Sequence, residues 1–238
     1  MRLTPELVAL VRREGAGEGG EFVLPPGTAP VSDEEQVAAV HRMLTAVPPG
    51  REVWLFAYGS LIWNPAHDFV EQRTGIVRGW HRSFCLGWDR WFRGRPEQPG
   101  LMLSLDRGGQ TKGVAYRLPP GAIEENMLRL YRREMRIKPP AHVPRWVNVT
   151  TSAGPVRAFT FVIDRNGGRY VSGLSDEAIA DALATAVGQR GSMAEYLHNT
   201  VCHLEELGLR DGHLWRLQEM VAERIEAARE RAARLPRK

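Results

Sequence analysis

Cysteine is scarce in this sequence: among 238 residues only Cys85 and Cys202 occur, far apart in the chain. Two cysteines so placed indicate neither a disulfide framework nor a metal-binding spacing. No stretch approaches the roughly 20 apolar residues of a membrane span. The N-terminus, Met1 to Glu6, lacks the charged segment and the long apolar segment of a signal peptide. These absences predict a cytoplasmic protein with reduced cysteines, no metal and no membrane partner.

Motifs for nucleotide and serine chemistry are also absent. The 24 glycines include no phosphate-binding loop and no dinucleotide fingerprint, so we expect no organic cofactor. Ser60 is followed by Leu61 and Ile62, which does not match the G-x-S-x-G pattern of a nucleophilic serine. A serine at a strand end more often bonds the backbone of a turn. We therefore do not assign Ser60 as a nucleophile.

Basic residues outnumber acidic ones, and most of them are arginine. The net charge is +4 and the isoelectric point is about 9.4, but acidic residues are scattered among the basic ones. Aromatic residues alternate with arginines at 78–82 and 88–93, a pattern that could stack on nucleobases. Alternatively, the same residues could form a strand and a loop that line a small-molecule pocket. Because no nucleic-acid-binding module is recognisable, we expect a small-molecule substrate and no nucleic acid.

The most informative segment is the one where an apolar run ends at Tyr58-Gly59-Ser60. Residues Val53 to Ala57 predict a short buried strand, and apolar residues resume at Leu61. The aromatic–glycine–hydroxyl step between them predicts a tight turn. Such a turn can direct backbone N–H groups toward an anionic or carbonyl oxygen. We interpret it as a candidate binding turn.

Periodicity and turn residues predict an α+β fold. The predicted helices cover residues 3–14, 32–46, 121–135, 176–187, 192–207 and 211–234. The predicted strands cover residues 53–57, 75–86, 101–106, 113–118, 145–151 and 156–163, with a hairpin turn at Gly108-Gly109. Strands this closely spaced leave no room for regular βαβ units. We therefore expect a small, mostly antiparallel β-barrel-like core flanked by helices, and not a doubly wound parallel sheet.

The helix predicted over residues 121–135 carries an acidic residue on its apolar face. At about 100° per residue, one arc of this helix contains Ile123, Met127, Leu130 and Tyr131. Glu134 falls near the middle of that arc, whereas Arg132 and Arg133 lie off it, on the expected solvated face. A buried carboxylate is costly unless it is paired, which makes Glu134 a candidate general base. The alternative is that Glu134 is only the last helical residue, exposed or paired with an arginine.

Several motifs occur in the order that one known family shows. They are Tyr58-Gly59-Ser60-Leu61-Ile62-Trp63-Asn64-Pro65, Gly79-Trp80-His81-Arg82-Ser83-Phe84-Cys85, Gln98-Pro99-Gly100, Gly113-Val114-Ala115-Tyr116-Arg117-Leu118-Pro119, Arg132-Arg133-Glu134-Met135, Ala186-Val187-Gly188 and Glu195-Tyr196-Leu197. With these motifs the chain resembles the ChaC family of glutathione-specific γ-glutamylcyclotransferases, especially its bacterial members. The likeness extends over most of the chain from Val53 onward.

The resemblance implies a γ-glutamylcyclotransferase-like fold, no metal and no organic cofactor. It implies an enzyme that converts glutathione to 5-oxoproline and cysteinylglycine, with Glu134 as catalytic base. The residues it implies for substrate binding are Ala57, Tyr58, Gly59, Ser60, Leu61 and Ile62. The catalytic domain would cover residues 51–220. Residues 1–50 would form an N-terminal helical extension with a Gly/Pro-rich linker, and residues 221–238 an Arg-rich helical tail.

One segment departs from the family pattern. After Met135, bacterial relatives usually run through a short Gly-containing turn to a tyrosine, but here the segment 136–146 is longer, contains prolines and has His142 near the tyrosine position. The alternative substrate is therefore another γ-glutamyl amine or peptide. A second alternative is a non-catalytic cation-transport regulator with the same fold.

Overall fold

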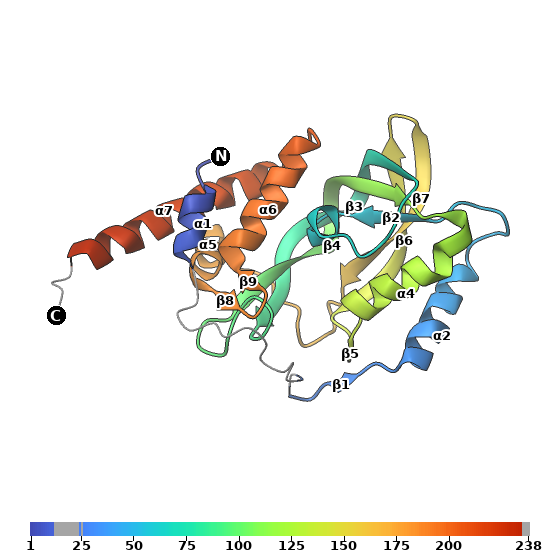
Figure 1. The fold of residues 1–238 in the computed structure, drawn as a ribbon, viewed down its shortest axis with the longest axis horizontal. Helices are drawn as coiled ribbons and strands as arrows, with labels where there is room; N and C mark the ends of the chain where they lie inside the picture. Colours follow the sequence, from blue (N-terminus) through green and yellow to red (C-terminus); the bar gives the residue numbers. More distant parts are fainter. Residues whose placement is uncertain (12–23, 25, 235–238) are drawn as a thin grey trace. The chain divides into compact units, whose positions relative to one another are not determined.

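The computed structural model describes residues 1–11, 24 and 26–234, and these fall into two compact units (Figure 1). We call the first the barrel unit; it consists of Leu24–Ser83 and Ser104–Tyr170. We call the second the helical unit; it draws on the ranges Met1–Val23, Phe84–Leu103 and Val171–Lys238. Each unit thus combines segments that are distant in the sequence.

A closed five-stranded barrel forms the centre of the barrel unit. Its strands, in the order of their pairing, are β2 (Trp54–Ala57), β4 (Gly100–Arg117), β3 (Glu71–Asp89), β6 (His142–Thr151) and β7 (Gly154–Ile163). β2 pairs antiparallel with β4 and parallel with β7, and β6 and β7 form an antiparallel hairpin. The ends of β3 and β4, residues 84–89 and 100–103, belong to the helical unit. The predicted α+β fold with a barrel-like core is confirmed.

One predicted turn is wrong. Gly108 and Gly109 have φ angles of +99° and +64°, which glycine adopts most readily, so both have the backbone that a turn requires. The chain nevertheless continues as one strand through them, and the two predicted strands at 101–106 and 113–118 are parts of β4. Local glycine conformation permits a turn, but pairing across the barrel decides whether the strand ends there.

The core of the barrel consists of alternating side chains from its strands. On β2 and just beyond it, Trp54, Phe56 and Tyr58 point to one side, as the two-residue period of a strand requires. They pack with Val77, Leu105, Ala115, Val147, Val149, Ala158 and Val162. The intervening residues Leu55 and Ala57 are also buried. β2 is therefore buried on both faces, in agreement with its continuous apolar sequence.

Two longer helices and a small two-stranded sheet also belong to the barrel unit. α2 (Asp33–Leu44) begins with a capping box between Ser32 and Glu35, and it packs against α4 (Ile123–Glu134), which follows the short 3-10 helix η1 (Pro120–Ala122). β1 (Ala29–Pro30) pairs with β5 (Ile137–Lys138) just after α4. In Figure 1, α2 and α4 lie side by side. The predicted extension 1–50 thus contributes residues to the same unit as α4.

The helical unit is built from α1 (Pro5–Leu10), α5 (Asp176–Thr185), α6 (Met193–Glu206) and α7 (Gly212–Arg234), with the small strand pair β8 (Val187–Gly188) and β9 (Gly191–Ser192). Its helices pack pairwise, and α7 buries Leu217, Gln218 and Val221 among other residues. The buried Gln218 carbonyl oxygen accepts the main-chain N–H groups of Arg2 and Leu3, each at 2.9 Å. This polar contact attaches the start of the chain to α7 without leaving a buried group unpaired.

The three predicted domains, 1–50, 51–220 and 221–238, remain predictions, because the two structural units do not have the same boundaries. The range 51–220 contributes to both units, and its predicted end, residue 220, lies inside α7. Part of the predicted linker, residues 15–23 and 25, lies outside the described residues. None of the helices in the described ranges is long and apolar enough to cross a membrane. Neither Cys85, which is buried, nor Cys202 is part of a disulfide bond among the described residues.

Candidate functional site

The predicted binding turn lies at the end of β2, in the barrel unit. After Ala57 the chain passes through Tyr58 and Gly59 into α3 (Ser60–Trp63), a single helical turn that the sequence did not predict. The Gly59 carbonyl accepts from the N–H of Ile62 at 2.9 Å. The first N–H groups of a helix have no partner within that helix. The strand end is therefore followed by main-chain donors, as the sequence pattern indicated.

Tyr58 anchors the turn in the barrel. Its side chain is buried in the barrel core, and its hydroxyl donates to the carbonyl oxygen of Phe161 on β7 at 2.9 Å. Its carbonyl accepts from the buried Arg82 on β3 at 2.5 Å, and Arg82 also donates to the Lys112 carbonyl at 2.7 Å. A Cβ at Gly113 would lie 2.4 Å from the Ala57 carbonyl oxygen, so glycine lets β4 approach the end of β2. Neighbouring strands thus hold the main chain of the turn.

Glu134 is the last residue of α4, so the helix ends one residue earlier than predicted. Its side chain is 18% exposed, and its apolar neighbours Met127, Leu130 and Tyr131 are fully buried, which agrees with the predicted arc. A carboxylate at a helix C-terminus is unfavourable in the field of the helix dipole. Pairing offsets that cost: Oε1 lies 3.0 Å from Nε of Arg133. The other oxygen, Oε2, lies 3.9 Å from Nδ1 of His142.

Arg133 links the glutamate to the turn. The same guanidinium that contacts Glu134 donates from Nη2 to the hydroxyl oxygen of Ser60 at 2.9 Å, and from Nη1 to the carbonyl of Asn64. The predicted assignment of Arg133 to a solvated face is wrong, because its side chain is only 20% exposed. The Ser60 hydroxyl accepts from a cation and does not donate to a base in this contact, which agrees with the expectation that Ser60 is not a nucleophile. The structure therefore brings the predicted turn and the predicted glutamate together through a residue between them.

Further contacts attach α4 to the segment after the turn. The buried side chain of Asn126 accepts the N–H of Asp68 at 2.6 Å and donates to the Ala122 carbonyl at 2.7 Å. The carboxylate of Asp68 also accepts from Arg129. Asn126 and Glu134 are eight residues apart, just over two helical turns, so their side chains leave α4 about 80° apart, within one half of its circumference. These contacts hold the part of α4 that carries Glu134 against residues 60–68.

Two buried histidines flank these contacts. The pKa of His67 is lowered from 6.5 to about 4, mainly by burial and also by the nearby Arg133 and Arg129 guanidiniums, while the Asp68 carboxylate opposes the shift. His67 packs edge-on against the ring of Tyr116, with centroids 4.9 Å apart. Burial also lowers the pKa of His142, and the Glu134 carboxylate opposes this. Both imidazoles are consequently neutral at pH 7.

Sequence reasoning missed Arg133, Asn126 and His67 as parts of this region. For Arg133 a signal existed, because the resemblance placed it beside Glu134 in a motif. Asn126 gave a weaker signal, a polar residue two turns before Glu134 on the same face. His67 follows the turn motif by a few residues, and no pattern marked it as buried. The contacts of these three residues are with other segments of the chain, and the position of a residue around its helix does not show which segment it will meet.

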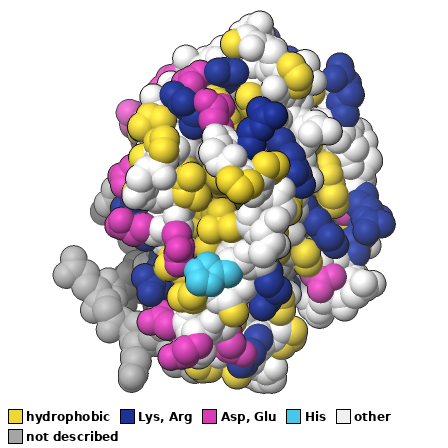
Figure 2. Space-filling model, turned by 90° about the vertical axis from the view of Figure 1, so that its right-hand side faces the viewer, with side chains coloured by type: hydrophobic (Ala, Val, Ile, Leu, Met, Phe, Trp, Pro, Cys, Tyr) yellow, Lys and Arg dark blue, Asp and Glu magenta, His cyan; other side chains and the backbone are white. Residues whose placement is uncertain are grey.

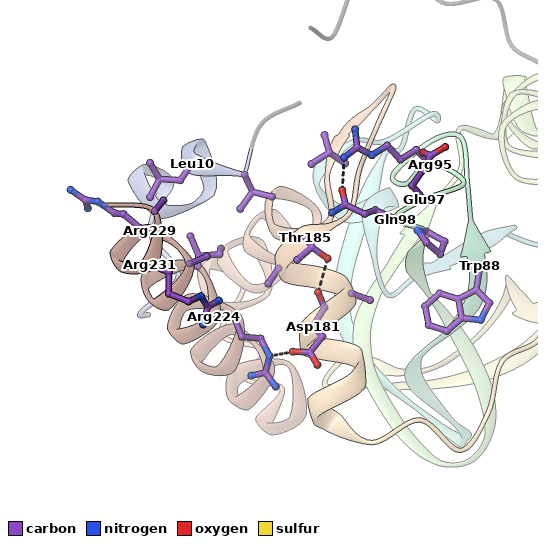
Figure 3. A pocket seen from close by; sticks show the side chains of 18 residues that line it. Leu10, Trp88, Arg95, Glu97, Gln98, Asp181, Thr185, Arg224, Arg229 and Arg231 are labelled. Carbon is purple, nitrogen blue, oxygen red and sulfur yellow. Dashed lines mark hydrogen bonds and ion pairs between the residues drawn. The ribbon is translucent and has the colours of Figure 1, made fainter. Parts of the chain in front are cut away.

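A cavity of about 1080 Å³ lies within the helical unit (Figure 3). Its walls include Leu10, Trp88 and Ile225 together with several arginines, and Figure 3 shows Arg224 paired with Asp181 and Arg95 with Gln98. None of the predicted site residues lines it.

Among the described residues, no group of three or more His, Cys, Asp or Glu side chains is arranged to hold a metal ion. The expectation of a site without metal stays a prediction.

Charge on the surface is mixed. On the face shown in Figure 2, basic and acidic side chains both occur, together with hydrophobic ones. Within the 88–93 stretch, Arg93 pairs with Glu195 at 2.6 Å, and the buried carboxylate of Asp89 accepts the N–H groups of Trp91, Phe92 and Arg93. These groups are engaged within the protein. The expectation of no nucleic-acid partner remains a prediction.

Comparison with known proteins points to one family. A family model described as ChaC-like protein matches residues 53–224. The glutathione-specific γ-glutamylcyclotransferase of Escherichia coli (strain K12) is 40% identical over 184 residues, which are 77% of this chain and 78% of that protein. The glutathione-specific γ-glutamylcyclotransferase 1 of Homo sapiens is 29% identical over 79% of this chain and 86% of its own.

A solved structure shares the fold. The crystal structure of a γ-glutamyl cyclotransferase specific to glutathione from yeast superposes with a TM-score of 0.64 at 20% identity, over 72% of this chain and 96% of that one. At this identity the likeness concerns the fold alone. It agrees with the barrel flanked by helices described above.

Proposed function

The chain belongs to the ChaC-like protein family, and on that premise we propose that it is an enzyme that cleaves the γ-glutamyl bond of glutathione by intramolecular cyclisation. The products are 5-oxoproline and cysteinylglycine. The name of the Escherichia coli relative, 40% identical over most of both chains, supports this substrate.

The reaction is an attack within one molecule. The α-amine of the γ-glutamyl group bonds to the γ-carbonyl carbon, closing a five-membered lactam, and the bond from that carbon to the cysteinyl nitrogen breaks. The α-amine is protonated near neutral pH, so it loses a proton before it attacks, and the departing nitrogen gains one. Nucleophile and electrophile are already linked. The covalent link already supplies most of the entropic advantage of proximity, so the part left to the enzyme is to hold the substrate in the conformer in which the amine approaches the γ-carbonyl.

Glu134 is the proposed base. Its carboxylate takes the proton from the α-ammonium group and later gives it to the departing amine, so that no net proton is consumed. One of its oxygens, Oε1, is held by Arg133 at 3.0 Å, and the side chain is 18% exposed. The carboxylate thus has a fixed position and remains accessible to a small molecule.

The turn from Ala57 to Ile62 is the proposed binding site for the γ-glutamyl group. Main-chain N–H groups at the start of α3 suit the α-carboxylate of the substrate or the oxyanion that forms at the γ-carbonyl. The bonds from Tyr58 to Phe161 and from Arg82 to Tyr58 hold the turn before substrate arrives. A site that needs no rearrangement loses less free energy on binding.

The observation that carries the proposal is the bridge made by Arg133. One guanidinium contacts Ser60 in the turn and Glu134 at the helix end, at 2.9 Å and 3.0 Å. Without such proximity, a binding turn and a base more than seventy residues apart would not form one site. The binding turn and Glu134 do not by themselves identify a reaction, and membership of the family indicates that it is γ-glutamyl cyclisation.

The test is a turnover assay with two variants of one helix. Purified protein is incubated with glutathione, and 5-oxoproline and cysteinylglycine are quantified. Glu134→Gln removes the base but keeps the shape, so kcat should fall by about 10²–10⁴-fold. Glu125→Gln, an exposed position of the same helix, is the control and should retain activity. Wild-type protein without turnover would overturn the proposed function, and full activity of Glu134→Gln would overturn the role of the base.

The alternative substrate is another γ-glutamyl amine or peptide, because the segment after Glu134 has its own structure here. β5 pairs with β1, and Lys138 forms an ion pair with Glu35 at 2.6 Å. A panel of γ-glutamyl compounds decides between the substrates by kcat/KM. A non-catalytic cation-transport regulator is not favoured, since the relatives reported above are named as cyclotransferases.

Two further points belong to the proposal. Residues 51–220 are the proposed catalytic region, with 1–50 as an extension and 221–238 as an Arg-rich tail. The proposed location is the cytoplasm, in agreement with Cys85 and Cys202 not being joined in a disulfide bond. Cell fractionation with the tagged chain tests the location.

A further inference from the structure

Asn126 is a fully buried polar residue of α4 that the proposed chemistry does not use. It lies beside Met127 and one turn before Leu130, which are also fully buried. Burying an amide is unfavourable unless its polar groups find partners, and asparagine is a weaker helix former than leucine or methionine. An asparagine on the apolar face of a helix is therefore explained by the contacts that its amide makes.

Both ends of the Asn126 amide are engaged. Its oxygen, Oδ1, accepts from the main-chain N–H of Asp68 at 2.6 Å and from Nη2 of Arg129 at 2.7 Å. Its nitrogen, Nδ2, donates to the Ala122 carbonyl at 2.7 Å. The two partners of the oxygen are donors only, and the partner of the nitrogen is an acceptor only. This orientation of the amide therefore satisfies all three contacts, and the flipped orientation would satisfy none.

The amide is a stronger attachment than the ion pair next to it. Arg129 also donates to the carboxylate of Asp68, but these side chains are 38% and 66% exposed. Water and salt screen such a pair, so it contributes little. The bond from the Asp68 main chain ends on a fully buried oxygen, and its loss would leave polar groups unpaired away from water. Asp68 is thus attached to α4 mainly through its main chain.

Asn126 and Arg133 hold one short segment at two points. Arg133 contacts Ser60 and Asn64, and Asn126 contacts Asp68. The seven positions from 126 to 133 correspond to about 10 Å along the helix and bring the two side chains within about 20° of each other around it. One strip of α4 therefore faces residues 60–68 over its whole length.

The two attachments differ in stiffness. The short side chain of asparagine has fewer rotatable bonds than that of arginine, so it follows a movement of the helix less easily. The apolar contacts of α4 are not directional and resist a small roll about the helix axis only weakly. A carboxylate lies about 5–6 Å from that axis, so a roll of about 10° displaces it by about 1 Å. Without Asn126, the flexible Arg133 would permit such a roll.

We propose that Asn126 is a positioning residue for Glu134: by holding the main-chain N–H of Asp68, it fixes the roll of α4 and hence the place of the carboxylate relative to the binding turn. The turn itself is held by the barrel through Tyr58 and Arg82, so the loss of Asn126 moves the base and leaves the turn in place. This inference rests on the proposed function for its activity readout. The position of Glu134 can be measured without substrate.

Two variants isolate the acceptor oxygen. Asn126→Asp keeps Oδ1 for Asp68, either ionised beside Arg129 or protonated toward the Ala122 carbonyl, whereas Asn126→Leu has a similar size and no acceptor. We expect kcat of Asn126→Asp to stay within about fivefold of the wild type, and kcat of Asn126→Leu to fall by about 10- to 100-fold, since a misplacement of about 1 Å can have that effect. KM should change by less than about threefold in both. Asn126→Ser, too short to reach Asp68, replaces Asn126→Leu if that variant does not fold.

Thr151→Val is the control for lost stability. The buried Thr151 hydroxyl donates to the Gly154 carbonyl at 2.6 Å where β6 and β7 meet, so this variant also loses a hydrogen bond within the barrel unit. Its thermal midpoint should fall while kcat is unchanged. Asp68→Asn removes the exposed carboxylate but keeps the N–H, so it should lose less than about threefold. Equal losses in Asn126→Asp and Asn126→Leu, full activity of Asn126→Leu, a rise in KM alone, or an equally large loss in Asp68→Asn would overturn the positioning role.

Crystal structures of the wild type and both Asn126 variants supply a readout that is independent of turnover. In Asn126→Leu the Glu134 carboxylate should shift by about 1 Å or more relative to Ser60, and in Asn126→Asp it should keep its wild-type position. An unmoved carboxylate in Asn126→Leu would overturn the inference even if that variant is less active. If the wild type releases no 5-oxoproline while the shift occurs, the proposed function fails and the positioning of Glu134 by Asn126 stands.

Discussion

Arg133 donates a hydrogen bond to Ser60 across 2.9 Å, although the two residues are 73 positions apart in the chain. The same guanidinium lies 3.0 Å from the carboxylate of Glu134. A planar guanidinium can serve several oxygens at once in a fixed geometry, which an ammonium group cannot. Arg133 thus sets the distance between the binding turn and the base, and the first two predictions follow from this.

Replacing Arg133 should impair catalysis strongly. Arg133→Met removes the contacts to Ser60, Asn64 and Glu134, and hydrogen bonds of charged groups contribute about 1.5–3 kcal/mol each. We expect kcat/KM for glutathione to fall by at least about tenfold. Arg133→Lys keeps the positive charge but lacks the planar guanidinium with its several N–H donors, so its activity should lie between those of Arg133→Met and the wild type. The measurement is steady-state release of 5-oxoproline.

Arg132→Met is the control for these variants. Arg132 is the preceding residue of the same helix, but its side chain is 51% exposed and its partner is Asp33 at 3.3 Å. An exposed pair of this kind contributes less than about 1 kcal/mol to stability. If Arg132→Met lost as much activity as Arg133→Met, the loss would reflect the net charge of α4 and the bridge would have no special role.

Ser60→Ala should weaken the enzyme without inactivating it. The hydroxyl accepts from Arg133, and losing one acceptor of a charged donor costs about 1.5–3 kcal/mol at most. We therefore expect kcat/KM to fall by about 10- to 100-fold or less. Mass spectrometry of the enzyme mixed with glutathione should show no covalent adduct. A γ-glutamyl adduct on Ser60, or a complete loss of activity in Ser60→Ala, would show that the serine is a nucleophile.

His67 should make the protein less stable as pH falls. Its pKa is about 4 in the folded protein because it is buried near Arg133 and Arg129, against 6.5 when exposed. Between these values the unfolded chain binds a proton that the folded chain does not. The free energy of unfolding therefore decreases as pH falls from about 6.5 to about 4, by on the order of 2–3 kcal/mol from this residue. Well below pH 4, where the imidazole is protonated in both states, this contribution no longer changes.

Urea unfolding between pH 4 and pH 7 measures the effect. In His67→Leu the decrease over that range should be smaller than in the wild type by the amount given above. His67→Leu should also be no less stable than the wild type at pH 4, because neither ring nitrogen has a hydrogen-bond partner among the described residues and leucine needs none. Identical pH dependence in the two proteins would contradict the lowered pKa of His67.

Much of the fold could be read from local patterns. The apolar run before Tyr58 is β2, and the apolar arc from Met127 to Tyr131 is the buried face of α4. The continuation of β4 through Gly108 and Gly109 could not be read, because both glycines have the conformation of a turn. α3 was missed as well, since four residues are too few for a periodic signal. Local preference describes what a segment can adopt, and pairing with other segments selects among those options.

The candidate site shows the same division. Motifs and helical phase alone determined two features: a turn with main-chain donors at Gly59 to Leu61 and a carboxylate on the apolar face of a helix at Glu134. Only the tertiary structure decided that Arg133 faces inward to join them and that His142 lies against the helix end. The physical reason is that periodicity records which side of an element is buried. The partner that a polar side chain meets there depends on how distant segments pack.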